Sequence, residues 1–102
     1  MNYPQHKYKA KPTELDGIRF DSKKEAQYYQ QLKLRRQAGD IVFFLRQVPF
    51  HLPGGVVLRV DFQVFDSDGN VRFIDTKGYK TEQYKAKKRM VEALYPVTIE
   101  EV

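Results

Sequence analysis

The sequence contains no cysteine, which excludes disulfide bonds and metal sites built from thiolates. It also lacks any long apolar segment, since the longest uninterrupted run is "IVFFL" at 41–45, far too short to span a bilayer. Residues 1–12 have no apolar stretch of the kind that forms a secretory signal. We therefore expect a protein of the cytoplasm, with no membrane partner.

Positively charged side chains outnumber negatively charged ones. Lysine and arginine number 18 against 13 aspartates and glutamates, for a net charge of +5. Such a balance favours a polyanionic partner, nucleic acid above all. A chain of 102 residues is typical of one domain. We expect a basic N-terminal arm at 1–12 and a single domain at 13–102.

Hydrophobic periodicity predicts an α/β fold, with a mixed sheet flanked by helices. Its order is a helix, a three-strand meander, a second helix and a last strand. This strand returns through a helix, so it is expected to run parallel to its neighbour. The predicted elements are a small hairpin at 13–20, a helix at 21–39, strands at 40–52, 56–65 and 71–78, a helix at 81–94 and a strand at 97–99.

The first predicted helix has one inward face with a charged member. Glu25, Tyr28, Tyr29 and Leu32 are spaced i, i+3, i+4 and i+7, so they share a face. Glu25 also stands three residues after Ser22, as in a capping box. The pattern leaves two roles open for Glu25, a site acid or a helix cap. The second helix is expected to bury Ala86, Met90, Ala93 and Leu94.

The loop "DSDGN" decides how the two central strands pair. A two-residue turn would place Asp61 and Asp75 on opposite faces and would move Ile74 to the polar face. A three-residue loop at 67–69 pairs Phe62 with Ile74 and keeps the apolar faces aligned. In this register Asp61 lies opposite Asp75, with Cβ atoms roughly 5 Å apart.

Two carboxylates at this spacing repel each other, unless a cation lies between them or their pKa values shift. Oxygen ligands of this kind suit Mg²⁺, with Mn²⁺ as a substitute. Lys77 follows Asp75 on the same face, where its ammonium can stabilise charge that develops on a phosphate. Glu25 is expected to reach this group from the first helix. The pattern indicates metal-assisted phosphodiester hydrolysis.

These parts, "SKKEA" at 22–26, "RVDF" at 59–62 and "DTKG" at 75–78, resemble the PD-(D/E)XK nuclease superfamily. The chain resembles small phage-associated members of this superfamily, which are related to junction-resolving endonucleases and to transposase endonuclease subunits. The resemblance covers residues 20–100 and implies a restriction-endonuclease-like core. It also implies that the protein acts in the cytoplasm of a bacterium or of a phage-infected host cell. The resemblance further implies that the protein is an Mg²⁺-dependent DNA endonuclease, that it acts in DNA recombination and that it needs no small-molecule cofactor. Val60 stands where the superfamily usually has proline.

The resemblance implies that Asp61 and Asp75 bind the metal, that Lys77 is the catalytic lysine and that Glu25 is a further acid or ligand. A second hypothesis is a DNA-binding module of the same fold within a larger phage or recombination assembly. A third is a basic structural protein without a site. Cutting both strands symmetrically calls for a homodimer. The residues expected to contact DNA are Lys7, Lys9, Lys11, Lys80, Tyr84, Lys85, Lys87 and Lys88.

Overall fold

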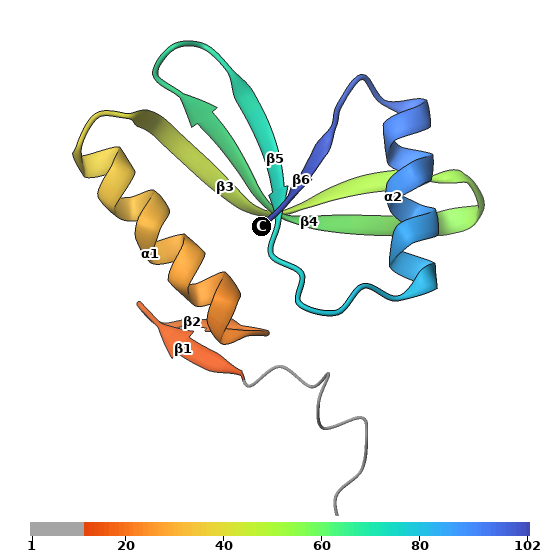
Figure 1. Cartoon of the computed structure of the whole chain (residues 1–102), viewed down its shortest axis with the longest axis horizontal. Helices are drawn as coiled ribbons and strands as arrows, with labels where there is room; N and C mark the ends of the chain where they lie inside the picture. The colour runs from red at the N-terminus through yellow and green to blue at the C-terminus, as the bar shows by residue number, and fades with distance from the viewer. Residues whose placement is uncertain (1–11) are drawn as a thin grey trace, which may run out of the picture.

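The computed structural model describes residues 12–102. Two small strands precede a helix, and a four-stranded sheet with a second helix completes the domain (Figure 1). No helix in the described part of the chain has the length and apolar character needed to cross a membrane. The elements are β1 (Thr13–Leu15), β2 (Ile18–Phe20), α1 (Lys23–Gln37), β3 (Ile41–Leu52), the 3₁₀ turn η2 (Pro53–Gly55), β4 (Val56–Asp66), β5 (Val71–Asp75), α2 (Glu82–Leu94) and β6 (Ile99–Glu101).

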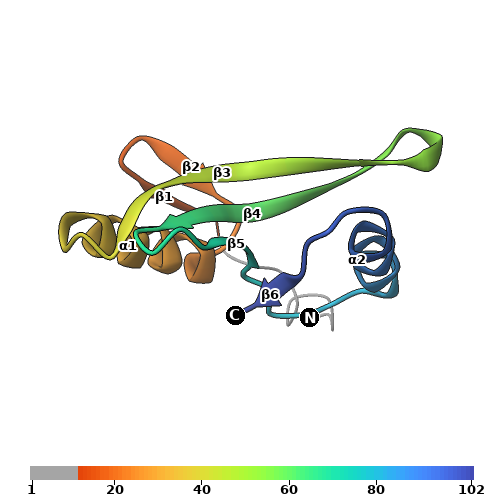
Figure 2. The same ribbon diagram turned by 90° about the horizontal axis from the view of Figure 1, so that it is seen from above.

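The main sheet is mixed, with strand order β3-β4-β5-β6. The first three strands pair antiparallel, and β6 pairs parallel with β5. This confirms the α/β class, the meander and the parallel last strand. Figures 1 and 2 show α1 beside one end of the sheet and α2 beside the other, beneath the tip of the β3–β4 hairpin.

The predicted hairpin before α1 is present as β1 and β2. Asp16 and Gly17 at its turn have φ values of 55° and 74°, as a type I′ turn requires. The Tyr29 hydroxyl donates to the Asp16 carboxylate at 3.0 Å, and Lys33 forms an ion pair with the same group. These contacts attach the small hairpin to α1.

The β4–β5 hairpin has the predicted register. The N–H of Asp66 donates to the Asn70 carbonyl at 2.8 Å, and the N–H of Gly69 donates back to Asp66 at 3.0 Å. Gly69 has a φ of 96°, which a residue with a side chain rarely adopts. Phe62 pairs with Ile74. One further step along this register places Asp61 opposite Asp75.

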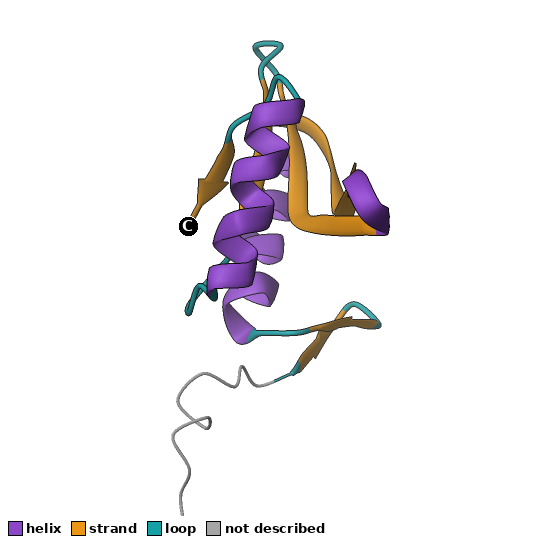
Figure 3. Ribbon diagram, turned by 90° about the vertical axis from the view of Figure 1, so that its right-hand side faces the viewer, coloured by secondary structure: helices purple, strands orange, loops and turns teal. Residues whose placement is uncertain are grey.

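The sheet contributes to two separate apolar cores, one against each helix. The change from one core to the other falls between Val60 and Phe62, so Asp61 lies at the boundary between them. Figure 3 shows that a long strand of the sheet bends sharply along its length. The α1 core contains Leu32, Ile41, Phe62, Val64 and Ile74. The α2 core contains Phe50, Leu52, Leu58, Val60, Tyr84, Val91 and Ile99.

The two helices differ in how well periodicity predicted their buried faces. In α1 the expected face is confirmed, since Glu25 and Leu32 are buried. In α2 the expected stripe was wrong, because Met90 and Leu94 are 36% and 57% exposed while Tyr84 and Val91 are buried. On the inward side of α2, the Tyr84 hydroxyl donates to the buried Asp75 carboxylate, and Val91 packs in the same apolar core.

Candidate functional site

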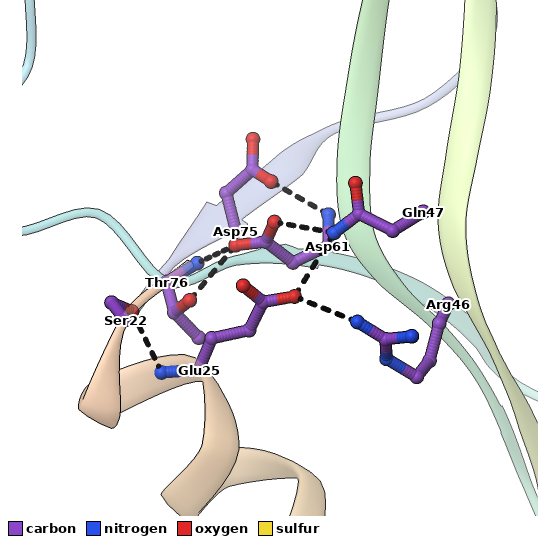
Figure 4. A network of polar contacts seen from close by, with 7 residues as sticks. All are labelled: Ser22, Glu25, Arg46, Gln47, Asp61, Asp75 and Thr76. Carbon is purple, nitrogen blue, oxygen red and sulfur yellow. Dashed lines mark hydrogen bonds and ion pairs between the residues drawn. The ribbon is translucent and has the colours of Figure 1, made fainter. Parts of the chain in front are cut away.

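Three buried acids meet where β5 ends. Glu25 comes from α1, Asp61 from β4 and Asp75 from the end of β5, and their exposed fractions are 3%, 7% and 0%. Figure 4 shows them together with their partners. A buried carboxyl group is costly unless it is hydrogen-bonded. The donors that each of these acids recruits therefore define the site.

Asp61 joins β4 to the residue that follows β5. Its Oδ2 accepts hydrogen bonds from the N–H and the hydroxyl of Thr76, both at 2.8 Å. Its Oδ1 accepts from the side-chain amide of Gln47 at 3.2 Å. Asp61 thus has protein donors on both oxygens and contacts β3 as well as the end of β5.

Asp75 binds the backbone of β4 and the second helix. Its Oδ1 accepts from the N–H of Asp61 at 2.8 Å, just beyond the last ladder pair, Phe62 and Ile74. Its Oδ2 accepts from the Tyr84 hydroxyl at 2.9 Å. The backbones of Asp61 and Asp75 are opposed as expected, but their carboxyl groups turn away from each other (Figure 4).

Glu25 sends its side chain into the site and not back to the helix start. Its N–H donates to the Ser22 hydroxyl oxygen at 3.0 Å, which confirms Ser22 as the N-cap. Its Oε2 accepts from Gln47 at 2.9 Å and from Arg46 at 3.3 Å. The capping box is therefore only half formed, and the carboxylate joins the acids of the sheet.

Sequence reasoning missed Arg46 and Gln47, which lie in the apolar strand β3. Both donate to Glu25, and the Arg46 guanidinium also lies 4.4 Å from the centre of the Phe20 ring. The only available signal was the polar pair "RQ" inside an apolar run. Such a pair is equally typical of a solvent-facing position on an edge strand.

Asp61 affects the ionisation of both neighbouring acids. Burial raises the pKa of Glu25 and the negative charge of Asp61 raises it further, while Arg46 and Gln47 act in the opposite direction. Burial likewise raises the pKa of Asp75. The N–H of Asp61 lowers that pKa, the charge of Asp61 raises it, and Lys77 and Tyr84 lower it. Both acids therefore hold a proton more readily in the folded protein than as free side chains.

These directions predict a pH dependence of stability. Because the folded-state pKa values of Glu25 and Asp75 lie above the unfolded values, their contribution is full below the unfolded pKa. It is lost as the pH rises through the folded pKa. Glu25→Gln removes one of the two titrating groups, so the part of the pH-dependent loss of stability that comes from Glu25 should disappear. Urea unfolding in EDTA from pH 4 upwards should show the wild type falling relative to this variant. Glu14→Gln, at an exposed position, is the control, and parallel curves for wild type and Glu25→Gln would contradict the assignment.

Lys77 lies half-buried at the edge of the acids. Its ammonium is 5.0 Å from the centre of the Tyr84 ring, and its charge favours the ionised form of Asp75. Tyr84 itself is 8% exposed and belongs to the α2 core. This corrects the expectation that Tyr84 contacts DNA, because its ring packs inside and its hydroxyl is bonded to Asp75.

Within residues 12–102, the lysines expected to contact DNA have partners in the chain. Lys80 and Lys88 both form ion pairs with Glu101, at 3.4 Å and 3.0 Å. Lys85 pairs with Glu82 at 3.1 Å, one turn away on α2. The ammonium of Lys87 donates to the Val57 carbonyl at 3.4 Å. Lys7, Lys9 and Lys11 lie outside the described residues.

The carboxylate oxygens of the site are suited to a hard divalent cation. Within the described residues, however, no three histidine, cysteine or acidic side chains are already grouped around one point. Glu25 Oε2 and Asp61 Oδ1 converge on one nitrogen, Nε2 of Gln47, at 2.9 Å and 3.2 Å. Carboxylate oxygens are the ligands that Mg²⁺ and Mn²⁺ prefer. Glu25 and Asp61 are thus the pair best placed to share a cation.

The comparisons with known proteins give one finding. A family model described as "Protein of unknown function (DUF1064)" matches residues 5–100. No curated protein and no solved structure gave a significant match. The matched range includes all three acids, Lys77 and both helices of the structure. The chain therefore belongs to the DUF1064 family.

Proposed function

We propose that the protein is an Mg²⁺-dependent DNA endonuclease with a restriction-endonuclease-like core. The observation that carries this proposal is the meeting of three buried acids from α1, β4 and β5, with Lys77 beside them. Their order and positions agree with the resemblance to the PD-(D/E)XK superfamily. A group of buried, mutually repelling acids at a strand end has a functional rationale that an ordinary surface ion pair lacks.

Each acid would have a distinct role. Glu25 and Asp61 would hold the metal, since their oxygens already converge. Bound there, Mg²⁺ supplies a Lewis acid for a phosphate oxygen and lowers the pKa of a water. Both oxygens of Asp75 accept from protein donors, as both oxygens of Asp61 do, so Asp75 would join the ligands through a remaining lone pair of its carboxylate or by releasing a donor. In this conformation it holds β4 and Tyr84 in place.

Hydrolysis would form a bond from the water oxygen to phosphorus and would break the bond from phosphorus to a sugar oxygen, which leaves and takes up a proton. Negative charge grows on the phosphate oxygens in between. Lys77 would stabilise this charge with its ammonium, which lies beside Asp75 over the Tyr84 ring. The exposed side of α2, with Lys85 and Arg89, would bind the backbone phosphates of DNA.

Cleavage assays test this function directly. A four-way junction and a linear duplex of the same sequence should be cut with Mg²⁺ and left intact with EDTA, and the junction should be cut faster. DNA binding without cleavage under both conditions would favour the alternative, a DNA-binding module within a larger assembly. A protein that neither binds nor cuts either DNA would overturn both readings.

Glu101 offers a test of the proposed DNA-binding face, which comprises Lys80, Lys85 and Lys88. It pairs with both Lys80 and Lys88, and its pKa is lowered by the hydrogen bond from Lys88. Glu101→Gln should free both lysines, tighten DNA binding and steepen its salt dependence. Lys85→Ala should do the reverse, by about one charge in the salt slope. The control is Glu100→Gln, at the exposed neighbouring position. Unchanged slopes in both variants would exclude this face.

A homodimer is part of the proposal, because two cuts in opposite strands call for two sites related by symmetry. Light scattering on the free protein and on its junction complex should give the mass of two chains in the complex. One chain per junction would limit the activity to a single nick per binding event.

A further inference from the structure

Gln47 has a left-handed backbone conformation in the middle of β3, where a strand residue is normally extended. Its φ is 53°, in the left-handed region that a residue with a side chain adopts only at an energetic cost. Asp16, with a φ of 55°, is explained by the type I′ turn that it helps to form. Gln47 lies inside a long strand, between residues that pair regularly with β4. A strained residue at such a place points to a function for its side chain.

The conformation of Gln47 changes where two neighbouring side chains point. In a regular strand, residues 46 and 47 would face opposite sides of the sheet. In this structure Arg46 and Gln47 donate to the same oxygen, Oε2 of Glu25, at 3.3 Å and 2.9 Å. The strained backbone thus brings two consecutive donors to one buried carboxylate.

The amide of Gln47 also spans the gap between two acids. Its Nε2 donates to Glu25 at 2.9 Å and to Asp61 at 3.2 Å, as Figure 4 shows. Two carboxylates that approach this closely repel each other. An N–H₂ group with its positive end between them offsets part of that repulsion without a formal charge. Its nitrogen occupies the place where the two oxygens converge.

We propose that Gln47 is a positioning residue that keeps Glu25 and Asp61 together in the metal-free protein and withdraws when a divalent cation binds between them. This inference rests on the proposed function, since it needs a metal at these two acids. It assigns Gln47 a role in setting metal affinity, because the cation must compete with the two hydrogen bonds of the amide.

If the cation competes with the Gln47 amide for the two acids, removing the amide should strengthen metal binding. Gln47→Met keeps the length of the side chain but removes both N–H donors. The metal-free variant should be less stable than the wild type, because the carboxylates lose their bridge. It should bind Mn²⁺ about tenfold more tightly, since displacing hydrogen bonds to a charged group costs roughly one factor of ten or more. Titration calorimetry with Mn²⁺ alone, without DNA, measures this affinity directly.

Two further variants make the test decisive. Gln31→Met, at an exposed position of α1, is the matched control and should bind Mn²⁺ as the wild type does. If Gln47→Met fails to fold, Gln47→Gly serves instead, because glycine tolerates the positive φ and also lacks the amide. It should likewise bind Mn²⁺ more tightly.

The outcomes separate this inference from the proposed function. Tighter Mn²⁺ binding, together with lower stability of Gln47→Met in EDTA, supports it. Weaker or unchanged Mn²⁺ binding overturns it, and Mg²⁺-dependent cleavage by the wild type in that case leaves the proposed function intact. If the wild type takes up no Mn²⁺ and cuts no DNA, both fall together.

Discussion

Lys77→Met is expected to lower the rate of Mg²⁺-dependent cleavage by about a hundredfold or more, the scale seen when one charge-stabilising donor is removed. Folding and DNA affinity should change little. Lys77 is half-buried at the edge of the acids, and its ammonium lies over the Tyr84 ring. A positioned cation matters most where charge develops in the transition state, and much less in the ground state.

Single-turnover cleavage, measured beside melting and DNA binding, checks this expectation. Lys24→Met is the matched control, because Lys24 reaches the Lys77 carbonyl at 3.4 Å but is exposed. If Lys77 only balances the charge of Asp75, the opposite pattern should appear. The Lys77→Met protein would then melt at a lower temperature and cleave normally once Mg²⁺ is supplied.

The register of the central hairpin could be predicted because two independent constraints agree. A side chain changes face with every residue of a strand, so a shift of one residue would have moved Ile74 out of the core. The loop "DSDGN" supplies a glycine at the one position that needs a positive φ. The opposition of Asp61 and Asp75 follows from these constraints alone.

The direction of the two carboxyl groups could not be predicted in the same way. It depends on where the ladder between β4 and β5 ends, which leaves the N–H of Asp61 to be satisfied by the Asp75 side chain. The rotation of α2 depends on the same event, because Tyr84 follows Asp75 inward. Periodicity placed Met90 and Leu94 inside, whereas the structure buries Val91 in the apolar core and Tyr84 with its hydroxyl on Asp75.

Gln47 and Glu101 were missed for a related reason. The left-handed conformation of Gln47 has no signature in a sequence, since glycine or asparagine is the usual residue there. Glu101 pairs with lysines 13 and more residues away in the chain. Its effect on the basic face appears only when β6 is placed beside β5. Contacts of this range depend on the folded sheet and not on local pattern.

Asp61→Asn is expected to raise the stability of the metal-free protein at neutral pH and to abolish cleavage. The charge of Asp61 raises the pKa of both Glu25 and Asp75, so one substitution relieves two repulsions. The remaining carbonyl oxygen of asparagine can still accept from Thr76, as Asp61 does. Its N–H₂ group would then face the Gln47 amide, so the hydrogen bond from Gln47 to this position is lost and offsets part of the relief. Relief of about 1 kcal/mol, the upper end of the energies of cross-strand pairs, would correspond to a rise of at most about 4–8 °C in melting temperature.

The response to Mg²⁺ distinguishes this explanation from a general gain in stability. Mg²⁺ should raise the melting temperature of the wild type, because a ligand that binds only the folded state stabilises it. In the Asp61→Asn protein this increment should vanish, since only Glu25 of the converging pair keeps its charge. Asp40→Asn removes an exposed carboxylate outside the site and should keep the full increment. An Asp61→Asn protein that melts like the wild type and still cuts DNA would remove Asp61 from the site.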